Sequence, residues 1–193
     1  ITTTNGSVLL SAGRNVNLLG AMTTTDGNMN ICAAQDITIG EKITLTRGSS
    51  IPAQSLGVPL GLTLFAGYGG AGSGVAGGTV VFAPSAPPAT VTGPNAPVTI
   101  TYNPVSYTTP TDYSPNFVLT GGATLSQHML VFPDGGDKTF DGTTTTTLRG
   151  LKGAPAGVTL VGPGTANFDD AALGTNNAIT FSGYTLRVPA VPN

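Results

Sequence analysis

The chain of 193 residues has no tryptophan, one cysteine and one histidine, and only 8% of its residues are charged. An ordinary globular domain carries roughly 25% charged residues. A helix at a protein surface needs charged or polar side chains on its outer face. The 7 Lys and Arg and the 9 Asp and Glu are too few to supply such faces, so the composition excludes a helical bundle or a coiled coil.

Concentrated positive charge and long apolar runs are also missing. The formal net charge is -2 and no basic cluster occurs, so the sequence offers no electrostatic footprint for nucleic acid or for an anionic membrane. No apolar run reaches the ~18 residues that a membrane helix needs. We therefore expect no nucleic-acid partner and no membrane insertion. The start at Ile1, without a signal-peptide pattern, predicts that the chain is a piece of a longer protein.

Glycine, proline and threonine are abundant instead. The chain holds 28 Gly, 15 Pro and 31 Thr, and its hydrophobic content of 39% is enough to bury a core. Threonine and the other β-branched residues favour strands, whereas glycine, proline and asparagine favour tight turns. The composition predicts an all-β protein.

A repeat with a 21-residue period runs through the N-terminal part. Gly6, Gly27 and Gly48 lie 21 residues apart, and Val8 returns as Met29. The other matched pairs are Leu10 and Ile31, Ala12 and Ala33, Asn15 and Asp36, Val16 and Ile37, Leu18 and Ile39, and Met22 and Ile43. Short alternating strands at a period near 20 are typical of a parallel β-helix, in which inward residues stack from coil to coil. We predict a right-handed parallel β-helix over residues 1–83. A leucine-rich repeat has a similar period, but its consensus is missing here.

The low charge has a cause in such a stack. A charge at a repeated position would face its like in the next coil, whereas Thr and Asn can form hydrogen-bonded ladders. After Gly48 the period loosens. We predict an outward loop at 49–57, a strand at 60–67, an irregular glycine loop at 69–78 and a last solenoid strand at 79–82.

A proline-rich stretch over residues 84–116 predicts an extended linker or capping segment with one strand at 98–102. Its tyrosines Tyr102, Tyr107 and Tyr113 are candidates for carbohydrate or partner contact, although such residues more often fix a linker to its neighbour. From 117 to 193, short strands alternate with turns at the spacing of a small antiparallel β-sandwich.

Acidic residues give little support to an enzyme. A β-helical glycosidase or lyase gathers carboxylates on one face, and here only Asp26, Asp36 and Glu41 lie in the repeat. The basic residues that a lyase needs do not recur in register. We expect no enzymatic activity and no cofactor. A β-helical polysaccharide-degrading enzyme, either a lyase or a tailspike-like depolymerase, is the alternative hypothesis.

We also expect no metal site. Asp134, Asp137 and Asp141 could hold calcium, but their spacing differs from an EF-hand and Asp-Gly is first a turn signal. His128 has no second His or Cys ligand nearby in the sequence. Cys32 has no cysteine partner, and we predict a small buried apolar side chain there.

Three sets of residues carry a resemblance to a known family. The coils, especially residues 6–13 and 28–31 onward, resemble the repeats of filamentous haemagglutinin-like exoproteins, large adhesins secreted by two-partner systems. Residues 117–193 resemble the YDG domain of these exoproteins, with Phe140 in place of the Tyr that names the motif. The matching segments are 137–144, 148–151, 164–168 and 182–186. Residues 96–104 resemble the joining segment of biofilm-type adhesins of this family.

The resemblance implies a non-enzymatic stalk at the bacterial cell surface that mediates cell–cell or cell–matrix adhesion. It implies extracellular polysaccharide or another cell-surface molecule as partner, and an outer-membrane secretion partner recognised through an N-terminal region that this chain lacks. A third hypothesis is an ice-binding solenoid, which needs Thr-x-Thr pairs repeated from coil to coil. We take Thr44 and Thr46 as an isolated pair and rank this hypothesis last.

Overall fold

A computed structural model describes residues 1–48, 57–70, 72, 77–153, 155–174 and 177–187. Most of the predicted loop at 49–57 and part of the glycine loop at 69–78 lie outside these residues. The described part is all-β, as predicted, with twenty strands and one 3₁₀ turn at Ser114–Asn116. The chain forms two compact units, one of residues 1–105 and 109–130, the other of residues 106–108 and 131–193.

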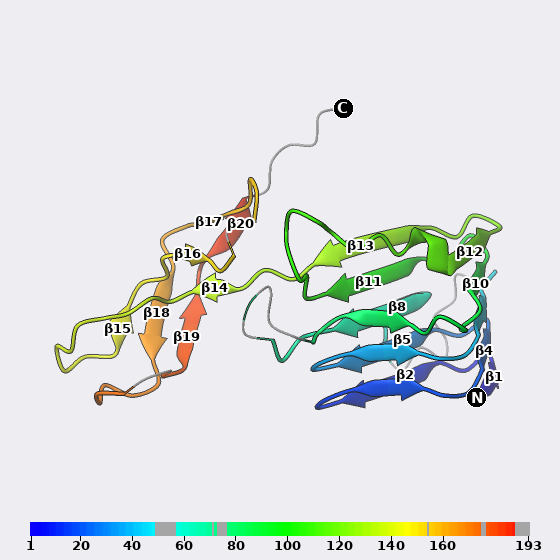
Figure 1. The fold of residues 1–193 in the computed structure, drawn as a ribbon, viewed down its shortest axis with the longest axis horizontal. Coiled ribbons are helices and arrows are strands. Elements are labelled where there is room, and N and C mark those ends of the chain that lie inside the picture. Colours follow the sequence, from blue (N-terminus) through cyan, green and yellow to red (C-terminus); the bar gives the residue numbers. More distant parts are fainter. Residues whose placement is uncertain (49–56, 71, 73–76, 154, 175–176, 188–193) are drawn as a thin grey trace. The chain divides into compact units, whose positions relative to one another are not determined.

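The first unit consists of three parallel sheets that the chain visits in turn (Figure 1). Sheet A contains β1 (Thr2–Thr4), β4 (Met22–Thr25), β7 (Ile43–Thr46), β10 (Ala89–Thr92) and β12 (Phe117–Thr120). Sheet B contains β2 (Val8–Ala12), β5 (Met29–Ala33), β8 (Leu62–Ala66), β11 (Val98–Tyr102) and β13 (Leu125–Met129). Sheet C contains β3 (Val16–Leu18), β6 (Ile37–Ile39) and β9 (Val80–Phe82). We call one passage of the chain through these sheets a coil.

Strand register confirms the 21-residue repeat. Val8 pairs with Met29 in sheet B, and Val16 pairs with Ile37 in sheet C. Each of the other apolar pairs matched in the sequence is also a pair of register partners. Later coils keep the register although the chain between them is longer, since Met29 pairs with Leu62 and Leu62 with Val98.

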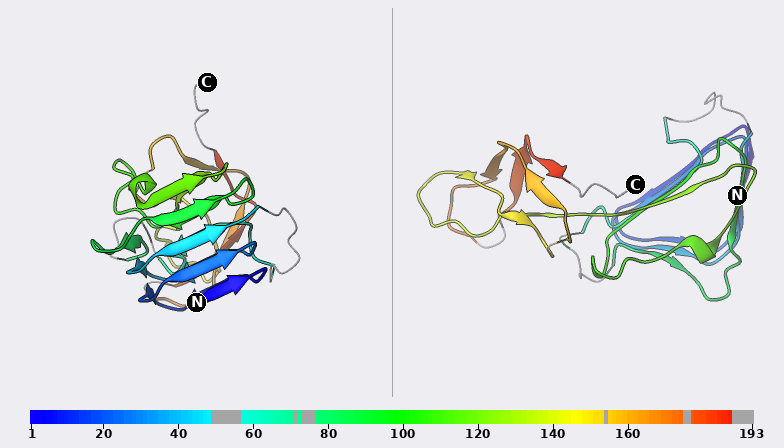
Figure 2. Two further views of the ribbon diagram at one scale, coloured as in Figure 1. Left: turned by 90° about the vertical axis from the view of Figure 1, so that its right-hand side faces the viewer. Right: turned by 90° about the horizontal axis from the view of Figure 1, so that it is seen from above.

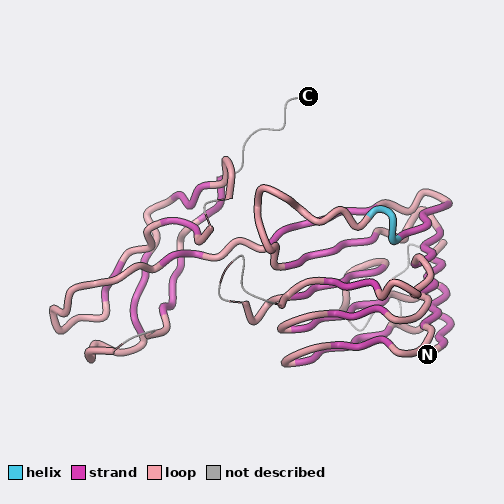
Figure 3. The backbone as a smooth tube through the Cα atoms, viewed as in Figure 1, coloured by secondary structure: helices cyan, strands magenta, loops and turns pink. Residues whose placement is uncertain are grey.

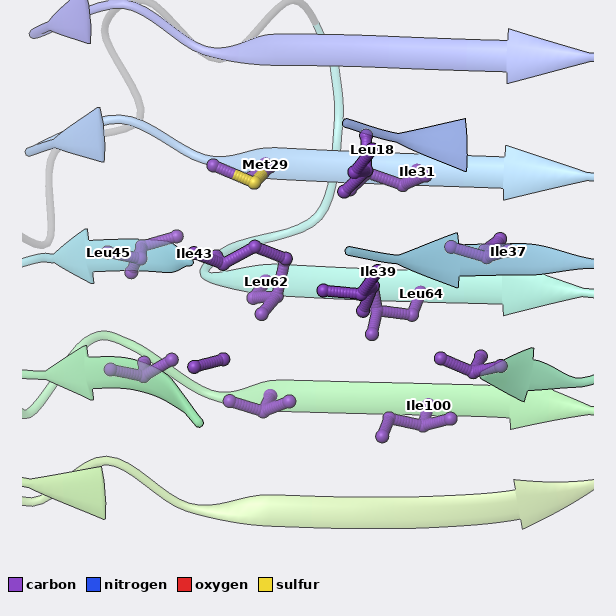
Figure 4. Packing of buried hydrophobic residues seen from close by; sticks show 14 of the residues in the cluster. Leu18, Met29, Ile31, Ile37, Ile39, Ile43, Leu45, Leu62, Leu64 and Ile100 are labelled. Carbon is purple, nitrogen blue, oxygen red and sulfur yellow. The ribbon is translucent and has the colours of Figure 1, made fainter. Parts of the chain in front are cut away.

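The core is the stack of inward residues from successive coils. Period-two alternation turns every second side chain of a strand inward, and Ile31, Leu64 and Ile100 in sheet B are each 0% exposed. They face inward residues of sheets A and C such as Leu45 and Ile39 (Figure 4). Full burial of one such side chain contributes roughly 1.5–3 kcal/mol, so the repetition of short strands builds a continuous core.

Side-chain oxygens at the turns hold each coil to the next. Ser7 Oγ accepts the Asn28 N–H at 3.0 Å, and Asn28 Oδ1 accepts the buried Gly61 N–H at 3.0 Å. A second series of the same kind starts from Asn15, whose Oδ1 accepts the Asp36 N–H, and Asp36 Oδ1 accepts the Thr79 N–H. We call these two series the corner ladders. They explain why a polar residue recurs at these positions, since it satisfies a backbone donor that the strands leave unpaired.

Gly61 is one turn position where only glycine fits. Its φ is +76°, and a Cβ atom there would lie 2.0 Å from the Pro97 carbonyl oxygen of the following coil. The backbones of adjacent coils therefore meet at this turn without room for a side chain.

The predicted proline-rich linker is in fact part of the parallel sheets. β10 pairs with β7 of sheet A, and β11, the strand that we predicted at 98–102, pairs with β8 of sheet B. The strand at 79–82 is therefore not the last strand of the parallel sheets. Prolines lie in the turns around these strands, where the missing N–H costs nothing, and the alternating residues between them enter the sheets.

The second unit begins later than predicted. Residues 117–130, which we placed in the antiparallel domain, form β12 and β13 and pair in parallel with β10 and β11. Their apolar residues alternate like those of the earlier coils. The boundary between the units accordingly lies at Val131.

Every strand pair in the described part of the second unit is antiparallel, and Figure 3 shows these strands as short stretches between loops. β18 (Thr165–Phe168) lies between β15 (Thr145–Thr146) and β19 (Ile179–Ser182). Two further pairs join β14 (Pro133–Asp134) to β16 (Gly150–Leu151) and β17 (Thr159–Val161) to β20 (Thr185–Arg187). The short strands between turns that we predicted are thus present in this unit, and each has two to four residues.

Candidate functional site

Two of the three tyrosines proposed for ligand contact are core residues. Tyr102 and Tyr113 are each 2% exposed and pack edge to face, with ring centroids 5.2 Å apart. The Tyr102 hydroxyl oxygen accepts the Thr111 N–H at 2.9 Å, and the Tyr113 hydroxyl lies 3.0 Å from Thr79 Oγ1. Burial raises the pKa of Tyr113. The prediction of a ligand-contacting surface is wrong for these two rings, because they fix the chain between β11 and β12 onto the first unit.

The third tyrosine, Tyr107, lies in the short segment 106–108 and is half-buried. Its contact role stays a prediction.

Asp141 stabilises a turn in the second unit. Its Oδ1 accepts the Thr143 N–H at 2.9 Å and the Thr143 hydroxyl at 2.8 Å, and lies 2.8 Å from Lys138 Nζ. These hydrogen bonds, chiefly the one from Lys138, lower the pKa of Asp141 to about 2. Gly142 follows with a φ of +75°. The Phe140-Asp141-Gly142 motif is thus a turn whose carboxylate is occupied by its own neighbours.

The other two aspartates of the proposed calcium group also belong to local structure. Asp134 Oδ1 accepts the Gly136 N–H at 3.2 Å, and the Asp137 carbonyl oxygen accepts a hydrogen bond from Arg149 Nη2. Among the described residues, no three His, Cys, Asp or Glu side chains gather as a metal site would require. The geometry favours the turn interpretation of these aspartates.

Two of the three acids of the repeat have structural partners as well. Asp26 Oδ1 accepts the Gly48 N–H at 3.0 Å, and Asp36 belongs to a corner ladder. Each carboxylate thereby satisfies a backbone donor of the following coil. Their positions are explained by turn structure without a reaction.

Cys32 lies on the outward face of β5, half-buried, rather than in the core as predicted. The alternation in β5 turns Ile31 and Ala33 inward, so Cys32 between them points outward. Its Sγ donates to Asn30 Oδ1 at 3.3 Å, and partial burial raises the pKa of the thiol. At neutral pH the group is therefore a thiol and not a nucleophilic thiolate.

An uncharged face with aromatic rings surrounds Cys32. The sheet-B face, as we define it, consists of the outward side chains of β5, β8 and β11 together with Tyr68: Asn30, Cys32, Thr63, Phe65, Tyr68, Thr99 and Thr101. Cys32 is the register partner of Phe65, which is in turn the partner of Thr101. The polar column beside them runs from Asn30 through Thr63 to Thr99.

Two rings form the centre of the sheet-B face. Phe65 and Tyr68 meet edge to face, with centroids 6.1 Å apart. Tyr68 is 47% exposed, and its hydroxyl donates to the Ala12 carbonyl oxygen at 2.8 Å, which fixes the ring. A fixed ring beside hydroxyl and amide groups offers an apolar surface and hydrogen-bonding groups together. This combination matches the alternating C–H and hydroxyl surfaces of a saccharide.

Sequence reasoning missed the sheet-B face although a signal was present. Phe65 follows Leu64 and precedes Ala66, both inward residues of β8, so the period-two pattern turns Phe65 outward. An outward aromatic residue in a strand of alternating pattern indicates a ring at the surface, whereas two of the three tyrosines in the proline-rich stretch are buried.

Comparison with known families identifies a YDG domain at residues 131–193. This range starts at Val131, where the second unit of the structure resumes. No curated protein and no solved structure matches the chain. No helix within the described residues is long and apolar enough to cross a membrane.

Proposed function

We propose that this chain is a non-enzymatic structural and adhesive part of a large secreted bacterial surface exoprotein of the filamentous haemagglutinin-like kind. In this proposal the first unit is a closed, right-handed parallel β-helix that acts as a rigid stalk. The YDG domain is a small sandwich-like module joined to it. The observation that carries the proposal is the unbroken register of parallel strands around one apolar core.

The way the coils are connected supports the proposed stalk role. Each of the strands β4, β7 and β10 is hydrogen-bonded to a neighbouring strand on both sides. The corner ladders add side-chain hydrogen bonds between coils. Bending the stack requires many of these bonds and the core contacts to change together. Such a structure is stiff along its length and can hold a binding surface away from a cell.

The sheet-B face is the surface that we assign to adhesion. Its partner is extracellular polysaccharide or another cell-surface molecule, since the face is uncharged and combines rings with hydroxyl and amide groups. The proposed location is extracellular or on the cell surface. Export depends on an outer-membrane secretion partner that recognises a region outside this chain.

Titration of the chain against neutral and acidic matrix polysaccharides tests this assignment. We expect saturable binding that Tyr68→Ala weakens at least about tenfold, or ~1.4 kcal/mol. Phe140→Ala is the matched control, because Phe140 is an exposed ring, 58% accessible, in the second unit. Equal binding by the Tyr68→Ala variant would contradict the role of the sheet-B face, and absence of saturable binding would leave only the stalk.

The enzymatic alternative is tested in the same incubations. Release of reducing ends or unsaturated products, abolished by Asp26→Asn or Asp36→Asn, would replace the adhesive proposal. The fold proposal predicts a far-ultraviolet circular dichroism spectrum dominated by β-structure.

A further inference from the structure

Sheet A carries a two-dimensional array of threonines on its outward face. One column consists of Thr2, Thr23, Thr44 and Thr90, which are successive register partners. The second column, two residues further along each strand, consists of Thr4, Thr25, Thr46, Thr92 and Thr120. None of these nine side chains is buried. We call them the threonine array.

The structure corrects the interpretation of Thr44 and Thr46 as an isolated pair. The same Thr-x-Thr pattern occurs in β1, β4, β7 and β10, and the pairing places the four copies side by side. β7 and β10 lie far apart in the sequence and yet keep the register. The 21-residue period of the sequence is lost between these two strands, but their threonines are still aligned by the strand pairing.

The strands set the spacing of the array. Neighbouring strands lie about 4.8 Å apart and alternate residues of one strand about 6.7 Å apart, which fixes the repeat in both directions. The left view of Figure 2 shows the five strands of sheet A side by side and in order. Threonine is stiff about χ1, so each position holds its hydroxyl and methyl group in a restricted orientation. At the end of the second column, the hydroxyl groups of Thr92 and Thr120 share a hydrogen bond of 2.8 Å, which orients these two side chains.

The threonine array is not accompanied by charged or exposed aromatic side chains within its strands. The five strands of sheet A contain no charged residue, and their one aromatic residue, Phe117, is buried. A charged partner would find no opposite charge in these strands, and a saccharide would find no outward ring to stack on. The face matches a partner that is neutral and repeats in two dimensions.

We propose that the threonine array binds the surface of an ice crystal. The two spacings of the array are close to oxygen–oxygen repeats on faces of hexagonal ice, so its hydroxyl groups can occupy lattice positions while the methyl groups fill the spaces between them. Binding needs no electrostatic attraction, since many weak contacts form at once on a fixed template. This activity goes beyond the adhesive role and uses a different face of the same unit.

The complete chain is tested by ice-affinity partitioning and by thermal hysteresis. We expect incorporation into a slowly growing ice phase and measurable hysteresis, both largely lost in Thr44→Tyr, where a bulky ring in the middle of the array holds the face off the lattice. Thr25→Tyr, in the other column, is a second variant. Thr38→Tyr, on the outward face of β6 in sheet C, is the matched control and should keep the activity.

Circular dichroism and thermal unfolding establish that each variant is folded. Exclusion of the folded parent chain from ice would overturn the proposal, as would equal activity of the folded Thr44→Tyr and Thr25→Tyr variants. Binding to cellulose or chitin particles without binding to ice would also overturn it, because the array would then recognise a crystalline polysaccharide.

Discussion

Both units of this chain are built from short strands, of three to five residues in the first and two to four in the second, but only the first has a substantial core. Its inward residues form one cluster from Val8 to Phe117, with most side chains inaccessible. In the described part of the second unit, the one buried hydrophobic residue is Ala166, whereas Phe140, Leu173 and Phe181 are at least half exposed. Strands of three to five residues bury a core when they stack in parallel register. Short antiparallel strands without such stacking depend on turns.

The largest expected effect tests this difference with one substitution made in both units. Leu64→Ala removes a fully buried side chain of β8, and we expect it to lower the free energy of unfolding of the first unit by about 2–5 kcal/mol. Leu160→Ala in β17 removes a half-buried side chain, so its effect on the second unit should be clearly smaller. Urea unfolding followed by circular dichroism measures both values. Equal losses would mean that the second unit has a core of comparable strength.

A second pair of variants asks how much of the first unit depends on its polar corners. Asn28→Ala deprives the buried Gly61 N–H of its acceptor, which should cost about 1–3 kcal/mol because the group cannot turn to water. Asn15→Ala removes the same kind of bond at an exposed position, to the Asp36 N–H, and water can replace it. We expect a smaller loss for Asn15→Ala. Thermal unfolding at fixed pH compares the two variants, and a larger effect of Asn15→Ala would contradict the role assigned to burial.

The smallest expected effect lies in the second unit and depends on pH. The pKa of Asp141 is lowered from 3.8 to about 2, so the folded state favours the carboxylate. The stabilisation is therefore complete above pH 3.8 and is lost as the pH falls through about 2. Carboxyl chemical shifts in an NMR titration should show this low pKa, and Lys138→Ala should move it back toward 3.8. A midpoint near 3.8 in the parent chain would show that the turn does not hold its carboxylate in this way.

The repeated part of the fold was predictable where the chemistry of each coil repeats. Val8 and Met29, and Asn15 and Asp36, showed the register because they are neighbours in space at constant spacing. The predicted organisation was wrong between residues 84 and 130, because the connections between β7 and β10 differ in length from the earlier ones and prolines obscured the continuing coils. When the turns differ in length, strand register is set by pairing in the sheet and cannot be read from the spacing of residues in the sequence.

The candidate sites were predicted less well for the same reason. Tyr102 and Tyr113 are conspicuous in the sequence, but their burial follows from a coil that we did not foresee. Phe65 and the threonines of sheet A gain their meaning from neighbours that lie in other coils. The alternation within one strand predicts to which face of the sheet a side chain points. Predicting a surface also requires knowing which strands are neighbours in the sheet.

The corner ladders have a consequence for how the chain reaches its structure. Each completed coil presents side-chain oxygens, such as those of Ser7 and Asn15, whose donors belong to the coil that follows. A completed coil thus presents hydrogen-bond acceptors for the next coil, which can form on it. Because each coil contacts only its neighbours, folding can propagate from one formed coil to the next without waiting for the rest of the chain.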